Sequence, residues 1–383
     1  MNSGLRIDPV GLARDLIRRP SVTPRDEGAM GVLEGVLEGL GFKCRRMRFG
    51  EIENLYARRG ETGPNLCFAG HTDVVPPGDA AAWRADPFEA RVEDGVLVGR
   101  GAVDMKGGIA AWVAAVAEVG EVAGSLSFLI TGDEEGPALD GTKKVVEALR
   151  AEGERIDHCL VGEPTSVREL GDVIKVGRRG SLNAWITVEG RQGHVAYPER
   201  AANPIPVLIR LLDRLEARRL DDGWPSFPPS NLELTTVDVG NTATNIIPAQ
   251  AKGRLNVRFN PAHTGERLIA WLTDECARAE AESGLKIRLE TLHSGDAFLT
   301  EPGPFVDLVT DTVDAVLGRR PEANTVGGTS DARFIRSLCP VVELGLVGQT
   351  MHQVDERAPV AEIERLRDVY AALIRRYFKT FAP

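Results

Sequence analysis

The sequence has 383 residues, of which 43% are hydrophobic and 27% are charged, as is typical of folded globular proteins. Single hydrophobic cores usually stop growing near about 250–300 residues, so this length predicts two domains. No apolar run reaches the roughly 18 residues of a membrane-spanning helix, and the start of the chain lacks the apolar core of a signal peptide. A net charge of −10 argues against nucleic acid as a partner. We therefore expect a cytoplasmic protein without membrane or nucleic-acid partners.

The cysteines are odd in number and are nowhere closely paired. They are Cys44, Cys67, Cys159, Cys276 and Cys339. This spacing fits neither a disulfide framework nor a C-x-x-C zinc site, so we expect reduced, mostly buried thiols.

Short apolar runs and helical patterns alternate through most of the chain. Buried strands are predicted at 65–70, 125–131, 158–162 and 340–345. Helices are predicted at 106–119, 140–150 and 361–378. The alternation predicts an α/β domain with a mixed, at least partly parallel sheet and helices on both faces.

The pattern changes at about Ser181 to alternating strands mixed with two helical stretches. Strands are predicted at 182–190, 232–240 and 251–259, and helices at 203–219 and 264–282. This βαββαβ-like order fits an α+β, ferredoxin-like domain with a four-stranded sheet and two helices on one face. We expect an insert at 181–294, with 1–180 and 295–383 forming the first domain.

His71 is the first informative histidine, because it comes directly after a predicted buried strand in GHTDVVPPGD (70–79). Open α/β sheets bind ligands at the carboxyl ends of their strands. Asp73 could accept a hydrogen bond from the imidazole and so fix its tautomer. Taken alone, the His-x-Asp pattern is equally consistent with a structural role.

Asp104 lies in GRGAVDMKGG (99–108), a glycine-rich turn that leads directly into a predicted helix. A dinucleotide-binding loop is disfavoured because the pattern is G-x-G-x-x-D and no ribose-binding acid follows at the expected place. A carboxylate at the start of a helix can also be an ordinary N-cap.

Three further polar sites follow predicted strands. Glu134 and Glu135 lie in TGDEEG (131–136), Glu163 follows 158–162, and His352 follows 340–345. Paired glutamates are often a solvated turn and a lone histidine is often structural. Adjacent carboxylates at the end of a buried strand, however, repel each other unless they share a cation or a proton.

Together, these residues occupy five predicted strand ends of one sheet. Imidazole and carboxylate groups without thiolate are typical of hydrolytic zinc sites. If Asp104 bridges two metals, each metal also receives one histidine and one glutamate. The spare glutamate of the adjacent pair is then available for proton transfer.

The chain resembles the zinc aminoacylase and carboxypeptidase superfamily. The resemblance rests on eight motifs in order along nearly the whole chain. They are GHTDVVPPGD, GRGAVDMKGG, DEEG, VGEPTS, GRRGS, RQGHVAYPE, GGTSDARF and MHQVDE.

The resemblance implies two zinc ions per subunit, which cobalt could replace, and a role for each residue of the set. His71 and Glu163 would bind one zinc, Glu135 and His352 the other, and Asp104 both. Glu134 would be the general base and Asp73 would hold His71.

The resemblance also implies a homodimer formed by 181–294, with His194 donating to the oxyanion in the partner's active site. Alternatively, His194 is an ordinary histidine of a surface loop. Arg178 and Arg258 match positions that bind substrate carboxylates. Other matching substrate positions are Arg179, Tyr197, Asn245, Gly328 and Thr329. The remaining histidines, His158, His263 and His293, match nothing and are predicted to be structural.

The substrate implied is an acylated amino acid, N-succinyl-LL-2,6-diaminopimelate, with acetylornithine or another acyl amino acid as the alternative. Thr244, Gly348 and Asp355 depart from the pattern of the enzymes that remove succinate, so side-chain and acyl specificity stay open. A metal-binding relative without activity is disfavoured because Glu134 and all the metal ligands are present.

Overall fold

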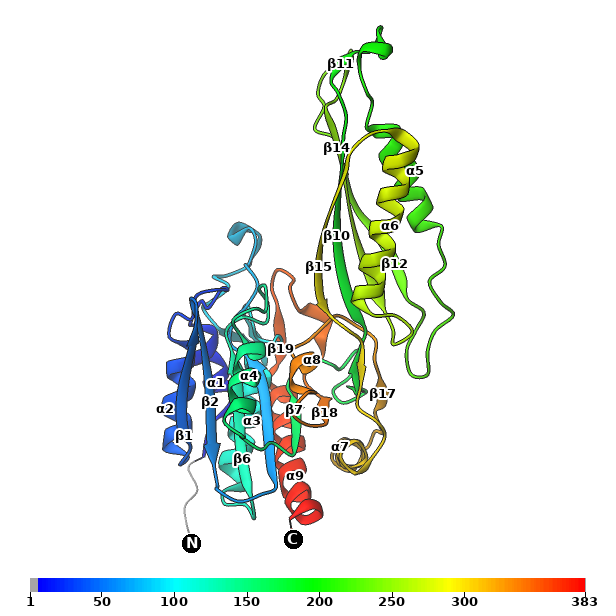
Figure 1. The fold of residues 1–383 in the computed structure, drawn as a ribbon. Coiled ribbons are helices and arrows are strands. Elements are labelled where there is room, and N and C mark those ends of the chain that lie inside the picture. Colours follow the sequence, from blue (N-terminus) through cyan, green and yellow to red (C-terminus); the bar gives the residue numbers. More distant parts are fainter. Residues whose placement is uncertain (1–5, 383) are drawn as a thin grey trace. The chain divides into compact units, whose positions relative to one another are not determined.

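The computed structural model describes residues 6–382, which form two compact units (Figure 1). Unit 1 contains the chain up to Gly177, Thr300–Asn324 and the chain from Ser330 onward. Unit 2 contains Arg178–Leu299 and Thr325–Thr329. The predicted insert, 181–294, lies inside the main segment of unit 2. No helix within the described residues is long and apolar enough to cross a membrane.

Unit 1 is built on one eight-stranded sheet, and its pairing confirms the predicted mixed sheet. In spatial order the strands are β1 (Lys43–Phe49), β2 (Ile52–Arg59), β6 (Ser125–Thr131), β3 (Asn65–His71), β7 (His158–Val161), β18 (Val341–Glu343), β8 (Val173–Lys175) and β17 (Glu322–Asn324). The central run β6-β3-β7-β18 is parallel throughout. β1–β2, β2–β6 and β8–β18 are antiparallel pairs.

The four strands predicted from apolar runs are the four central ones. The four outer strands were not predicted. β1 has one buried residue, and β8 and β17 have three residues each, so their apolar signal is weak. β2 is mostly buried and was nevertheless missed.

Both faces of this sheet are covered. β3 and β6 are buried at every one of their seven positions, and successive side chains point to opposite faces. Phe68 on β3 stacks on Trp112 of α3 (Lys106–Val119) at 4.8 Å, and both rings contact Tyr370 of α9 (Val360–Phe381). The other helices of unit 1 are α1 (Pro9–Ile17), α2 (Ala29–Gly39), α4 (Thr142–Ala151), α7 (Pro304–Leu317) and α8 (Ala332–Ile335).

A separate three-stranded sheet supports the turn before α3. It contains β4 (Arg91–Glu93), β5 (Val96–Val98) and β19 (Arg357–Pro359) in the order β19-β5-β4. β5 enters the 99–105 turn and β19 follows the segment with His352. Their antiparallel pairing therefore brings these two segments side by side.

Unit 2 has the predicted βαββαβ order. Its elements are β10 (Gly180–Glu189), α5 (Ile205–Glu216), β12 (Asn231–Asp238), β14 (Gln250–Phe259), α6 (Gly265–Ser283) and β15 (Ile287–Gly295). The sheet order β12-β14-β10-β15 is ferredoxin-like and fully antiparallel. Leu182, Ala184, Ile186 and Val188 alternate into the core beneath α5 and α6, which lie on one face of the sheet (Figure 1).

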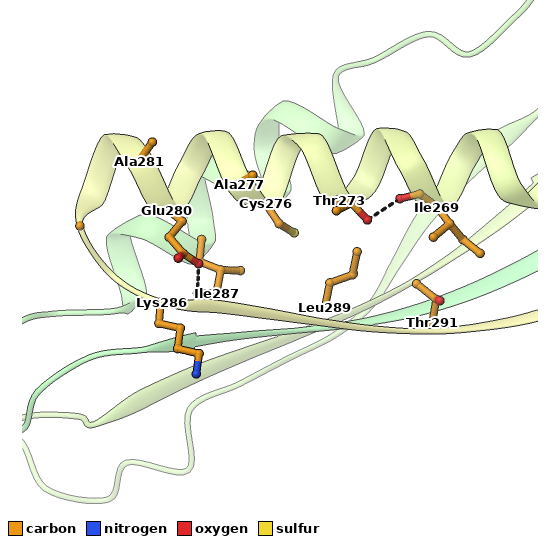
Figure 2. Close-up of a pocket in the computed structure, with 11 residues that line it drawn as sticks. Ile269, Thr273, Cys276, Ala277, Glu280, Ala281, Lys286, Ile287, Leu289 and Thr291 are labelled. Carbon is orange, nitrogen blue, oxygen red and sulfur yellow. Dashed lines mark hydrogen bonds between the residues drawn. The ribbon is translucent and has the colours of Figure 1, made fainter.

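A groove of about 880 Å³ runs between α6 and the edge strand β15 (Figure 2). Apolar side chains such as Ile269, Cys276 and Leu289 line it, and Lys286 lies at one end. There the Glu280 carboxylate accepts a hydrogen bond from the backbone N–H of Ile287 at 2.8 Å.

Candidate metal centre

The parallel run β6-β3-β7-β18 brings four of the predicted sites to one edge of the sheet, because parallel strands end on the same side. His71 is the last residue of β3, and Glu163 lies two residues after β7. Glu134 and Glu135 follow β6 at the start of the next turn. His352 comes later after β18, beyond the short helix η3 (Gly348–Thr350).

Asp104 reaches this edge by another route, so the expectation that all five sites end strands of one sheet is wrong. Asp104 follows β5 of the small sheet through the glycine-rich turn and precedes α3. Sequence patterning did not separate the two sheets, because a three-residue strand carries too little periodicity to assign its partners.

The Asp104 carboxylate lies between the two histidines. Its Oδ1 is 3.1 Å from Nε2 of His71, and its Oδ2 is 3.3 Å from Nε2 of His352. Glu163 Oε1 is 3.7 Å from the same Nε2 of His71, and Glu135 Oε1 is 2.9 Å from the same Nε2 of His352. The five side chains therefore form one chain of contacts, in which Asp104 joins two histidine–glutamate pairs.

This arrangement fits divalent cations. Nitrogen and oxygen ligands about 2.0–2.2 Å from a tetrahedral zinc ion lie roughly 3.3–3.6 Å from one another, close to the contacts seen here. Two sets of three residues also bring their ligand atoms close together. Within each set the three atoms lie within 4.8 Å of one another. One set is His71, Asp104 and Glu135, and the other is His71, Glu134 and Glu163. Four gathered carboxylates repel each other unless a cation or protons are shared among them.

The pKa values in the cluster show the same crowding of charge. Hydrogen bonds to Asp104 and Glu135 raise the pKa of His352 to about 10. Burial lowers the pKa of His71, but the hydrogen bond to Asp104 and the charge of Glu163 outweigh it and raise the value well above 6.5. Burial, followed by the charge of Glu163, raises the pKa of Glu134. Without a bound cation the cluster therefore retains protons.

His71 is oriented differently from the prediction. Its Nδ1 donates to the backbone carbonyl of Asp73 at 2.9 Å, while the Asp73 carboxylate lies 3.7 Å away. This bond leaves Nε2 as the nitrogen that is free to bind a metal. The Asp73 carboxylate instead accepts hydrogen bonds from the backbone N–H groups of Glu134 and Glu135 at 3.2 and 3.0 Å. It therefore holds the turn that carries the glutamates.

Thr23 completes this arrangement, and sequence reasoning missed it. Its hydroxyl donates to the Asp73 carboxylate at 2.7 Å. Fifty residues separate the two positions, and no local signal in the sequence links them.

A second missed residue is Glu356, which is fully buried next to the Asp104 turn. Its carboxylate pairs with the buried Arg100 at 2.8 Å and accepts a backbone hydrogen bond from Asp104 at 3.0 Å. In the sequence it is one of 56 acidic residues, and only its place in MHQVDE could have drawn attention to it.

The pattern of Peptidase family M20/M25/M40 matches residues 67–376 of the chain. This stretch contains the whole candidate metal cluster, which consists of His71, Asp104, Glu134, Glu135, Glu163 and His352. The chain belongs to this family. A curated relative from Caulobacter vibrioides, named succinyl-diaminopimelate desuccinylase, is 69% identical over 377 residues, covering 98% of this chain and 97% of its own.

Solved structures of the M20 family share the fold. An M20 family metallo-carboxypeptidase from Sulfolobus solfataricus matches with a TM-score of 0.84 at 16% identity, covering 97% of this chain and 99% of its own. A dinuclear metal-binding M20 peptidase from Bacillus subtilis matches with a TM-score of 0.72 at 17% identity, covering 97% and 98%.

In this M20 chain, the candidate carboxylate-binding residues lie in unit 2, near the start of β10. Arg178 donates to the carbonyl of Gly328 at 3.2 Å, next to Thr329. Arg258 pairs across the sheet with Ser181 and donates to the Asn256 side chain at 3.0 Å. The other candidate, Arg179, donates to the Asn231 side chain at 2.8 Å. The geometry thus gathers the three arginines near one end of the sheet.

His194, Tyr197 and Asn245 form a second group beyond the other end of β10. His194 lies on β11 (Gly193–His194), which pairs with β13 (Ile246–Ile247), and the Asn245 carbonyl accepts a hydrogen bond from Val195 at 3.1 Å. His194 is exposed, as is Tyr197. Nδ1 of His194 accepts a hydrogen bond from the backbone N–H of Ala196 at 3.0 Å, so the neutral ring carries its proton on Nε2. His194 is thus a hydrogen-bond donor.

The three remaining histidines have partners away from the cluster. His158 Nδ1 is 3.0 Å from the hydroxyl of Tyr377, and His263 and His293 are each 3.1 Å from an aspartate, Asp221 and Asp296. These contacts fit the structural roles predicted for them.

Proposed function

We propose that this protein is a zinc-dependent amide hydrolase that converts N-succinyl-LL-2,6-diaminopimelate and water into succinate and LL-2,6-diaminopimelate. The chain of contacts Glu163–His71–Asp104–His352–Glu135, with Glu134 beside it, carries the hydrolase part of the proposal. The identity of 69% to a named desuccinylase supports the substrate. The proposal includes a cytoplasmic location, which the named biosynthetic relatives support.

Two zinc ions fit the ligand set: His71 and Glu163 would hold one, His352 and Glu135 the other, and Asp104 both. Bound there, the zinc ions would polarise the amide carbonyl and lower the pKa of a water molecule to near neutral. Glu134 lies within 4.8 Å of the ligand atoms of His71 and Glu163 and is not needed as a ligand.

Glu134 has the position and environment of a general base. It takes a proton from water as the oxygen attacks the amide carbon, and it returns the proton to the nitrogen as the C–N bond breaks. Asp73 assists by holding the backbone of this turn through two N–H groups.

The arginines favour a substrate with several carboxylates. Guanidinium groups bind carboxylates in a planar, two-donor geometry. Arg178 and Arg258 both lie near the start of β10, and two guanidinium groups there could bind more than one carboxylate of a succinyl substrate. An acetyl group lacks that carboxylate.

The position of His194 supports a role in the partner's active site. β10 has ten residues, and at about 3.3 Å per residue it is roughly 30 Å long. Arg258 lies at its beginning and His194 beyond its end. One chain therefore cannot place both side chains on one acylated amino acid, whereas two subunits of a symmetric homodimer can each supply one of them.

A substrate comparison tests the proposal. Zinc-loaded protein is assayed with N-succinyl-LL-2,6-diaminopimelate, N-acetylornithine and a neutral N-acyl amino acid, and product amine is quantified. We expect the succinyl substrate to have the highest kcat/KM, and the Glu134→Gln protein, purified in the same way, to measure contaminating hydrolase. Faster hydrolysis of N-acetylornithine would show that the protein is a different deacylase. If none of the amides were hydrolysed, the proposal that the protein is an amide hydrolase would be wrong.

A further inference from the structure

Glu356 forms a buried network whose bonds all lead to two segments of the metal cluster. Its Oε1 accepts hydrogen bonds from the backbone N–H groups of Val103 and Asp104 at 2.9 and 3.0 Å. Its Oε2 accepts from the N–H of Gly101 at 3.0 Å and from Nη1 of Arg100 at 2.8 Å. Each hydrogen bond of this carboxylate within the described residues thus goes to residues 100–104, the turn that places Asp104.

Arg100 extends the network to the other segment. Its Nη1 also donates to the carbonyl of Gln353 at 3.2 Å, and its Nη2 donates to the carbonyl of His352 at 3.4 Å. His352 has a φ of 61°, a left-handed conformation that a residue with a side chain adopts only where its surroundings hold it. Arg100 supplies hydrogen bonds directly at this strained backbone.

Glu356 and Arg100 are both buried, so their charges need well-placed hydrogen-bond partners. Glu356 is 0% exposed and Arg100 is 2% exposed. Two buried charges are tolerated only when their geometry is good and their remaining hydrogen-bonding capacity is used. Four donors meet that requirement for the Glu356 carboxylate and fix its position closely, whereas Nε of Arg100 has no hydrogen-bond partner among the described residues.

We propose that Glu356 is a positioning residue of the metal centre: it fixes the turn that carries Asp104 and, through Arg100, the segment that carries His352. The inference rests on the metal ligands assigned in the proposed function. Residues that orient metal ligands typically change metal affinity by about 10–100-fold when they are substituted.

Glu356 and Arg100 should differ in how they affect the binding of the two zinc ions. Asp104 lies between both histidines, so a shift of its turn alters the ligands of both zinc ions. Arg100 bonds directly to the His352 segment, and His352 belongs to only one zinc site. Loss of the Glu356 carboxylate should therefore weaken both zinc ions, whereas a change of Arg100 that keeps its charge should weaken mainly one.

Two substitutions isolate these effects. Glu356→Gln keeps the size of the side chain but turns a donor toward two other donors in either orientation of its amide. Arg100→Lys keeps the positive charge toward Glu356 but cannot bond the carboxylate and two carbonyls from one planar group. Glu154→Gln is the matched control, because it removes an ion pair to Arg58 that belongs to unit 1 but contacts no segment of the cluster.

Zinc affinity is measured for the chelated full-length proteins by competition with a chromophoric chelator, together with the melting temperature of each zinc-free protein. We expect Glu356→Gln to weaken both zinc ions by about 10–100-fold, Arg100→Lys to weaken one by a similar factor, and Glu154→Gln to weaken neither. A lower melting temperature alone, with both zinc affinities unchanged in Glu356→Gln, would overturn the inference in favour of a purely structural role.

The Arg100→Lys protein keeps the test decisive if Glu356→Gln does not fold, since unchanged affinity for both ions in that variant would also overturn the inference. Wild-type protein serves to separate the two proposals. If it failed to bind two zinc ions, the proposed function would be wrong and this inference with it. If all the proteins bound two ions equally well, only the inference would be wrong.

Discussion

The candidate metal cluster of unit 1 and the His194 hairpin of unit 2 differ in how their side chains are held. In the cluster, His71, Asp104 and Glu163 are buried and lie at strand ends or turns fixed by backbone hydrogen bonds, while Glu135 is half-buried and His352 is exposed. His194 lies on a two-residue strand, is exposed, and has one hydrogen bond that fixes its ring. The difference leads us to expect that the fold of unit 1 holds the candidate ligands in place by itself, and that the exposed His194 acts only next to a second subunit.

Replacement of Glu134 tests whether the cluster separates metal binding from proton transfer. We expect Glu134→Gln to lower kcat by roughly 10²–10⁴-fold, because a general base is lost, and to retain two zinc ions. Kinetics and metal analysis of one preparation measure both properties. Loss of zinc together with activity, or substantial remaining turnover, would show that base and ligand are assigned wrongly within the DEE run.

Mixing of two inactive proteins tests whether the hairpin acts across subunits. Glu134→Ala and His194→Ala homodimers are unfolded and refolded together. A mixed dimer has one complete site, because its His194→Ala subunit keeps Glu134 and receives His194 from its partner. With random pairing about half the dimers are mixed, so activity should recover to roughly a quarter of wild type.

Mass spectrometry of the refolded sample confirms that mixed dimers are present. Each protein refolded separately is the control. If mixed dimers form and no activity returns, His194 serves its own chain or has a structural role.

Replacement of Arg178 tests the other end of unit 2. We expect Arg178→Lys to lose about 2–4 kcal/mol of transition-state stabilisation, or roughly 30- to 1000-fold in kcat/KM for the succinyl substrate, because an ammonium cannot reproduce the planar fork. Arg210→Lys, an exposed change on α5, is the matched control. Unchanged kinetics would move the carboxylate site to Arg179 or Arg258.

Zinc binding should also depend on pH. The pKa of His352 is raised to about 10 and that of His71 also lies well above 6.5, so zinc must displace protons at neutral pH. Affinity should therefore rise with pH, by up to about tenfold per pH unit for each proton displaced. Competition titrations between about pH 6 and pH 8 measure it. A constant affinity would show that the cluster is already deprotonated.

The sequence was sufficient to predict the parts of the fold whose signals are local. Helix 106–119 and strand 125–131 agree with the structure residue for residue, because a long apolar face and a fully buried strand both leave a strong pattern. The order of elements in unit 2 was predicted from alternating strand patterns and helical stretches, although β12 has no buried residue. Strand β1, which has one buried residue, left no such pattern.

The network around the candidate ligands could not be predicted, because backbone groups form much of it. Asp73 was expected to accept from the His71 ring, but a backbone carbonyl does so and the carboxylate holds the next turn. Glu356 and Thr23 contribute through burial and through partners far away in the chain, and neither property is encoded in neighbouring residues. Side-chain types indicated the chemistry of the site, while the fold determines which atoms support it.

The length of β10 has a consequence for how activity depends on protein concentration. If the arginines and His194 of one active site come from two chains, an isolated chain has no complete site. Specific activity should then fall as the protein is diluted below the dissociation constant of the dimer, and the rate should become second order in protein. Because β10 separates the arginines from His194 within one chain, the catalytic rate would report the fraction of the protein that is dimeric.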